Sequence, residues 1–181
     1  MEASKIIGRI QESNELNRSY HSNEAEFIIV YGRRRVGKTF LVREFFHDNF
    51  AFQLTGIYDK PKELQLTNFA AALQEHSNRT QATPLSWLEA FGQLKDYLKD
   101  LHTEEKKVVF IDEMPWLDTR QSDFLSAFEW FWNGWGASQD DLMLIVCGSA
   151  TTWITDKLLG NKGGLFNRAT CRIYLHPFTL G

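Results

Sequence analysis

The segment that most constrains this chain is a glycine-rich octapeptide at residues 32–39, with the sequence GRRRVGKT. It fits the pattern GxxxxGK[ST], and it stands between a short apolar run, FIIVY at residues 27–31, and an amphipathic stretch that reaches residue 49. In this setting a buried strand, a tight loop and a helix follow one another, so backbone N–H groups and the helix N-terminus can surround phosphate groups. The octapeptide therefore predicts a nucleoside triphosphate site.

Each position of the octapeptide has an expected role at a bound triphosphate. Gly32 and Gly37 allow the tight path of the loop, Lys38 reaches the β- and γ-phosphate oxygens during catalysis, and the Thr39 hydroxyl binds magnesium. The predicted nucleotide-binding residues are Gly32, Arg33, Arg34, Arg35, Val36, Gly37, Lys38, Thr39 and the adjoining Phe40. The arginines in this set are equally compatible with added positive potential at the phosphates and with a contact to nucleic acid.

Two carboxylates follow another apolar run. Residues 108–111 read VVFI, and Asp112 and Glu113 come directly after them. Acidic residues at the end of a buried strand, downstream of a phosphate loop, are typical of the Walker B motif. Asp112 is expected to hold magnesium, and Glu113 to orient and deprotonate the attacking water. This pair favours hydrolysis over simple binding.

Three further places in the chain are weaker candidates. Ser149 follows the apolar run at residues 142–147 and could contact the γ-phosphate or the attacking water, or cap the next helix. Arg168 is a candidate charge-sensing arginine. Gly8 and Arg9 lie where a segment could fold over the adenine.

Two other stretches bear on the ligand. The string NKGG at residues 161–164 lacks the aspartate of the guanine-reading NKxD pattern, which favours adenine and hence ATP. The aromatic residues between positions 128 and 135 could stack on nucleic-acid bases, but a buried helix face is the preferred interpretation because no basic residues interleave with them.

Apolar and amphipathic segments alternate along the chain. The strands are expected at residues 27–31, 51–55, 108–111, 142–147 and 171–175, and the helices at 38–49, 62–76, 84–101, 122–133 and 151–159. Strands that are apolar throughout are buried on both faces. The pattern therefore predicts an α/β fold with a mostly parallel sheet covered by helices on both sides.

Composition limits the partners and the compartment. A length of 181 residues with 43% hydrophobic side chains suits one domain over residues 1–181. The net charge of −3 gives no general attraction to DNA or to an anionic membrane. No apolar run approaches the ~18 residues of a membrane span, and two cysteines without metal-ligand spacing fit reduced thiols. These features predict a cytoplasmic protein.

Four segments together resemble one family: YGRRRVGKTFLVREFF, VVFIDEMPWL, LIVCGSATTWI and LFNRATCRIYLHPFTL. They are similar to the archaeal-type ATPases of the STAND class, P-loop NTPases related to AAA+ proteins. The resemblance implies a three-layer sandwich with a five-stranded sheet in the order 5-1-4-3-2, and Mg²⁺-dependent ATP hydrolysis used as a conformational switch. By position it implies the sensor-1 role for Ser149 and an arginine near the site for Arg168.

The same resemblance shapes the expected partners. Members of that family continue into a helical lid, a winged helix and often a nuclease-like domain, so residues 1–181 are expected to be a truncated ATPase core. Its own C-terminal domains, ATP and ADP are the expected partners, with a homo-oligomer possible and DNA unsupported by charge. Two alternatives stay open, namely a non-hydrolysing ATP-binding switch and a nucleic-acid-dependent motor or loader.

Overall fold

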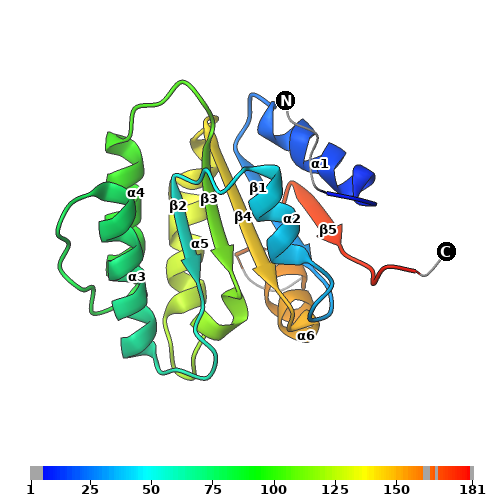
Figure 1. Cartoon of the computed structure of the whole chain (residues 1–181). Helices are drawn as coiled ribbons and strands as arrows, with labels where there is room; N and C mark the ends of the chain where they lie inside the picture. The colour runs from blue at the N-terminus through cyan, green and yellow to red at the C-terminus, as the bar shows by residue number, and fades with distance from the viewer. Residues whose placement is uncertain (1–5, 161–163, 166, 180–181) are drawn as a thin grey trace.

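A parallel β-sheet forms the middle layer of the molecule, and helices cover both of its faces (Figure 1). The computed structural model describes residues 6–160, 164–165 and 167–179, and within these residues the sheet has five strands in the order β2-β3-β4-β1-β5. The strands are β1 (Glu26–Tyr31), β2 (Phe52–Thr55), β3 (Lys107–Asp112), β4 (Leu142–Gly148) and β5 (Cys171–Tyr174). Read in reverse, this is the order 5-1-4-3-2, so the predicted α/β sandwich is confirmed.

The helices divide between the two faces of the sheet. One face is covered by α1 (Ile10–Tyr20) and α2 (Lys38–Phe45), and the other by α3 (Lys62–Ser77), α4 (Trp87–Asp100) and α5 (Phe124–Gly134). The shorter elements are η1 (Met114–Leu117), η2 (Gly136–Ser138), α6 (Thr151–Trp153) and the π-helical η3 (Ile154–Leu159). In the described part of the chain, none of these helices is long and apolar enough to cross a bilayer.

Strand β1 shows why the sheet is buried on both sides. Phe27 and Ile29 pack into the core beneath α3, α4 and α5, whereas Ile28 and Val30 pack into the core beneath α1 and α2. Each of these side chains has 0% exposure. Because neighbouring strands are parallel throughout, their carboxyl ends meet at one edge, and the loop after β1 starts there.

Two helices differ from the prediction. Helix α1 has no counterpart among the predicted helices, because it buries only Leu16 and Ser19 and so carries no apolar stripe at helical spacing. Helix α2 ends at Phe45, earlier than predicted, because His47 and Asp48 adopt positive φ values of 52° and 55° that no helix can continue through.

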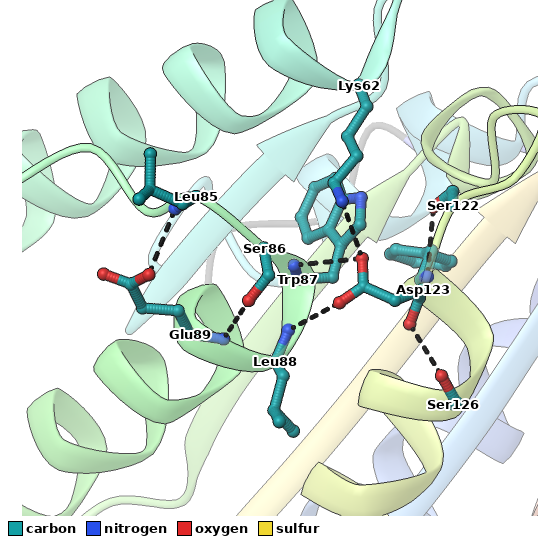
Figure 2. Close-up of polar contacts among 10 residues, drawn as sticks. Lys62, Leu85, Ser86, Trp87, Leu88, Glu89, Ser122, Asp123 and Ser126 are labelled. Carbon is teal, nitrogen blue, oxygen red and sulfur yellow. Dashed lines mark hydrogen bonds and ion pairs between the residues drawn. The ribbon is translucent and has the colours of Figure 1, made fainter.

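A side chain that precedes α5 hydrogen bonds to the first residues of α4 (Figure 2). Asp123, which precedes α5, accepts hydrogen bonds from the backbone N–H groups of Trp87 and Leu88, each at 3.3 Å. Its carboxylate also lies 3.3 Å from the Nζ of Lys62 at the start of α3. Ser86 caps the same helix by accepting a backbone N–H at 3.1 Å. Asp123 thereby joins the first turns of three helices.

Candidate functional site

The loop between β1 and α2 has the tight path that the sequence predicts. Gly37 is the N-cap of α2 and has a φ of 93°, in the region that favours glycine. Gly32 has a different constraint, because a Cβ atom there would lie 2.5 Å from the carbonyl oxygen of Leu175. Both glycines are therefore required by the backbone, and the loop opens onto the N-terminus of α2, where anions bind well.

Lys38 is folded back over the loop. Its side chain is almost fully buried, and Nζ donates to the carbonyl oxygens of Gly32 at 3.0 Å and Arg33 at 2.7 Å. Burial lowers the pKa of Lys38, and the nearby carboxylates of Asp112 and Glu113 oppose that shift. The ammonium group therefore lies inside the loop, where phosphate oxygens can replace the carbonyls as acceptors.

The two predicted metal ligands lie against each other. The Thr39 hydroxyl donates to Oδ2 of Asp112 at 2.7 Å, and the Glu113 backbone N–H donates to Oδ1 at 2.9 Å. Burial raises the pKa of Asp112, which is 4% exposed, while these two hydrogen bonds oppose the rise. An alcohol and a carboxylate supply the hard oxygens that magnesium prefers, with water and phosphate oxygens completing its shell. The donor set therefore fits magnesium.

Glu113 points toward the end of the neighbouring strand. Its backbone is left-handed, with φ 50° and ψ 42°, and its Oε2 accepts a hydrogen bond from the Ser149 hydroxyl at 3.3 Å. The alternative role for Ser149 as a helix cap is not observed, because the N-cap of α6 is Ala150 and has no side-chain cap bond. The predicted catalytic residues from β3 and β4 are thus brought together.

Two residues near Glu113 escape the sequence prediction. A Cβ atom on Gly56, directly after β2, would lie 2.4 Å from the Glu113 carbonyl oxygen, so this position accepts only glycine without a shift. Gln65 is fully buried on α3 and hydrogen bonds to the segment after Glu113. The sequence does hold a sign of Gln65. It lies next to Leu66 and four positions before Phe69, so it is a polar residue on the apolar face of the helix.

Arg9 hydrogen bonds to the phosphate loop from outside it. It is only 8% exposed, and its Nη2 donates to the carbonyl oxygens of Val36 at 3.1 Å and His176 at 2.7 Å. Its guanidinium also lies 4.1 Å from the centroid of the Phe178 ring, which packs beside Gly8. These contacts bring Gly8 and Arg9 to the loop, and their contact with adenine stays a prediction.

Arg168 lies away from the phosphate loop. It is exposed and precedes Cys171, which pairs with Ile28 near the beginning of β1, whereas the loop follows Tyr31 at the other end of that strand. Arg168 is therefore at the opposite edge of the sheet, and the geometry does not support its predicted contact with phosphates held by the same chain. Residues 161–163, which begin the NKGG string, lie outside the described part of the chain.

The remaining predicted binding residues divide between core and solvent, because Val36 is buried in the core whereas the others are exposed. Arg33, Arg34 and Arg35 are exposed, and Phe40 is 53% exposed on α2. The guanidinium of Arg34 lies 5.8 Å from the centroid of the Tyr58 ring. The three arginines are exposed side chains of the loop itself, so the choice between phosphate and nucleic acid as their ligand stays open.

Comparison with known proteins agrees with this geometry. A family model described as an ATPase domain predominantly from Archaea matches residues 7–180. The uncharacterized protein MJECL04 of Methanocaldococcus jannaschii is 26% identical over 172 residues, which cover 95% of this chain and 36% of that protein. The uncharacterized ATP-binding protein MJ0423 of the same organism is 48% identical over 40 residues, or 22% of this chain and 68% of that protein.

Solved structures share the fold at low sequence identity. The Walker-type ATPase PABY2304 of Pyrococcus abyssi superposes with a TM-score of 0.67 at 21% identity, over 97% of this chain and 55% of that one. Cdc6p from Pyrobaculum aerophilum gives 0.64 at 17% identity, over 98% and 47%. A chain of the Drosophila ORC bound to DNA gives 0.65 at 14%, over 98% and 44%. The chain thus spans about half the length of these structures.

Proposed function

This chain belongs to the family of ATPase domains found predominantly in Archaea, and on that basis we propose that it binds ATP with magnesium and hydrolyses it to ADP and phosphate. The observation that carries the proposal is the 2.7 Å hydrogen bond between Thr39 and Asp112. It joins the phosphate loop to the end of β3, directly beside Glu113. A metal ligand from each motif and a general base are then next to one another.

Binding uses groups that the ligand-free loop already presents. The backbone N–H groups of residues 33–39 and the N-terminus of α2 surround the phosphates. Lys38 exchanges its two carbonyl acceptors for phosphate oxygens, and Thr39 and Asp112 would hold a magnesium ion. A bound magnesium ion neutralises charge on the phosphates. Gly8 and Arg9 lie on the side of the loop where we place the adenine.

Hydrolysis assigns the proton transfer to Glu113. Its carboxylate accepts a proton from water as the water oxygen bonds to the γ-phosphorus, and the bond from that phosphorus to the bridging oxygen breaks to release ADP. Ser149 keeps the carboxylate directed toward the ends of β3 and β4. The low exposure of Asp112 and Lys38 strengthens their electrostatic contribution.

The class of ATPase, its cellular role and its domain organisation are proposed from the sequence motifs. We assign the chain to the STAND class, with hydrolysis acting as a conformational switch that drives an effector in the cytoplasm. Residues 1–181 act as one ATPase core, which could work in a homo-oligomer. Two of the similar structures are Cdc6p and a chain of a DNA-bound ORC, and their identities of 17% and 14% support the shared fold alone.

Phosphate release in the presence of magnesium tests the proposal. Glu113→Gln is expected to lower the rate by about 10²- to 10⁴-fold, because it removes a general base, while ATP affinity stays within about threefold. Lys38→Ala is expected to weaken ATP binding by about tenfold or more, because it removes a charged donor to the phosphates. Glu104→Gln, at an exposed position near the start of β3, makes the same chemical change at the opposite edge and is the matched control.

Three outcomes would change the conclusion. Equal rates for wild type and Glu113→Gln would remove Glu113 as the base. Recovery of unhydrolysed ATP after long incubation with wild type would favour the non-hydrolysing switch. Stimulation of phosphate release by DNA, lost at high salt, would favour the nucleic-acid-dependent ATPase.

A further inference from the structure

Gln65 is a buried polar side chain among apolar neighbours. It lies in the first turn of α3 with 0% exposure, and its flanking residues on the same helix face belong to the core. A buried amide is costly unless its donors and acceptor are paired. The hydrogen-bond partners of the Gln65 amide therefore indicate the role of this residue.

The amide of Gln65 connects two separate segments. Its Oε1 accepts from the Ile57 backbone N–H at 3.0 Å, and its Nε2 donates to the Ile57 carbonyl at 2.7 Å. The same Nε2 donates to the carbonyls of Lys60 and Trp116, each at 3.2 Å. Gln65 thus ties the loop after β2 to η1, the short helix that follows Glu113.

Both segments contact the backbone of the acidic pair. The Trp116 N–H donates to the Glu113 carbonyl at 3.1 Å, and the Gly56 N–H donates to the Asp112 carbonyl at 2.9 Å. The Tyr58 and Trp116 rings meet edge to face, with centroids 4.4 Å apart, which adds a second contact between the loop after β2 and η1. The turn that carries Glu113 is therefore held on both sides by segments that Gln65 fixes.

The turn needs such support because of its conformation. Glu113 has a left-handed backbone with φ 50°, which a non-glycine residue keeps only when its surroundings impose it. That conformation sets the direction of the side chain, whose carboxylate reaches Ser149 at 3.3 Å. A small rotation of the turn would move the carboxylate away from both Ser149 and the phosphate loop.

We propose that Gln65 is a positioning residue for ATP hydrolysis, acting through the turn that directs the Glu113 carboxylate. The inference rests on the proposed function, in which Glu113 is the general base. The hydrogen bonds of Gln65 described above reach neither the phosphate loop nor the metal-ligand pair. Its loss therefore affects the chemical step and leaves nucleotide binding nearly intact.

The test compares Gln65→Met with wild type in steady-state and single-turnover phosphate release. Methionine keeps the length of the side chain and removes its hydrogen bonds. The expected result is a kcat lower by about tenfold or more, with KM for ATP within about threefold, since misplacement of a reacting group by about 1 Å costs up to 10²-fold. Asn68→Ala is the matched control, because Asn68 lies on the same helix and donates to the Thr55 carbonyl at 2.9 Å without reaching the Glu113 turn.

A double variant separates positioning from a merely structural role. If Gln65 acts through Glu113, then Gln65→Met is expected to cause no further loss in a Glu113→Gln background. An unchanged kcat in Gln65→Met, or equal losses in the two backgrounds, would overturn the inference. Should Gln65→Met not fold, Gln65→Asn is scored by the same criteria, because it keeps an amide but is one methylene shorter and cannot hold the Ile57 and Trp116 backbones in the same geometry.

The two proposals fail in different ways. If wild type releases no phosphate above the enzyme-free control, the proposed function itself is wrong, and if wild type and Glu113→Gln are equally active, Glu113 is not the base. If wild type is active, Glu113→Gln is inactive and Gln65→Met matches wild type, then only the role of Gln65 is wrong.

Discussion

The hydroxyl of Ser149, at the end of β4, donates to Oε2 of Glu113, at the end of β3, across 3.3 Å. The two strands are neighbours in the sheet, and their last residues lie at the edge where the phosphate loop begins. The bond engages one of the two carboxylate oxygens of Glu113. A serine at this place therefore restrains the base through one hydrogen bond.

Removing the Ser149 hydroxyl is expected to slow hydrolysis without preventing ATP binding. A single hydrogen bond contributes about 0.5–1.5 kcal/mol, so Ser149→Ala should lower kcat by about 2- to 10-fold. Ser149→Thr keeps the hydroxyl and is expected to retain more of the rate. Single-turnover phosphate release measures the difference, and a rate for Ser149→Ala equal to that of wild type would contradict the assignment.

Two glycine-to-alanine changes should have opposite effects on stability. At Gly56 the new Cβ would lie 2.4 Å from the Glu113 carbonyl oxygen, so Gly56→Ala should lower the free energy of unfolding by about 1–3 kcal/mol and reduce activity. At Gly92, inside α4, nothing lies within 4 Å of the new Cβ, so Gly92→Ala should raise stability by about 0.5–1 kcal/mol. Urea unfolding measures both. A destabilised Gly92→Ala would show that the helix is packed differently.

Loss of the Asp123 carboxylate should loosen the junction of helix starts shown in Figure 2. Asp123→Ala is expected to cost about 1–2 kcal/mol, the usual range for a lost cap, and Asp96→Ala, at an exposed position on α4, should stay within about 0.5 kcal/mol. Chemical denaturation at neutral pH compares the two variants. Equal stability of Asp123→Ala and wild type would mean that water replaces the cap.

The same carboxylate predicts an acid dependence. Burial raises the pKa of Asp123, but hydrogen bonds from Trp87, Leu88 and Lys62 outweigh that effect, and the pKa lies below its ordinary value of 3.8. Its contribution to stability is therefore fully present above that pH and is lost as the pH falls through the folded-state pKa. The stability difference between wild type and Asp123→Ala should shrink in that acid range.

His76 predicts a second pH dependence, nearer neutrality. Burial lowers the pKa of His76 from 6.5, an effect that the charge of Glu75 opposes, and the unprotonated Nε2 accepts the Gln53 backbone N–H at 3.2 Å. The unfolded chain takes up a proton near pH 6.5, whereas the folded chain takes it up only at a lower pH, so stability should fall as the pH drops below 6.5. Unfolding curves between pH 7 and pH 5 should show a flatter profile for His76→Gln than for wild type. His102→Gln, at an exposed position, is the control.

The sheet could be predicted because its strands are apolar on both faces. Residues 142–147 and 27–31 have no polar side chain to confuse the pattern, and each is bounded by glycine or by polar residues. The phosphate loop and Asp112 were equally predictable, because their chemistry is concentrated in short contiguous segments. The structure brings these segments together as expected.

The contacts between distant segments could not be predicted. Gln65 and Gly56 act through backbone carbonyls, which leave no mark on the residue types that they contact. Helix α1 leaves almost no apolar pattern in the sequence, because it buries only Leu16 and Ser19. The charge-sensing role of Arg168 stays a prediction, and the sequence could not place this residue because a position next to a strand does not tell which edge of the sheet a side chain reaches.

Arg9 has a practical consequence for anyone who shortens this protein. One guanidinium group holds the carbonyl of Val36, in the phosphate loop, and that of His176, after the last strand. A fragment that starts at residue 10 or stops at residue 175 keeps every strand and both acidic residues, yet it loses this tether. We expect such fragments to fold and to bind nucleotide more weakly, so the boundaries chosen for expression decide whether the loop is measured in its native shape.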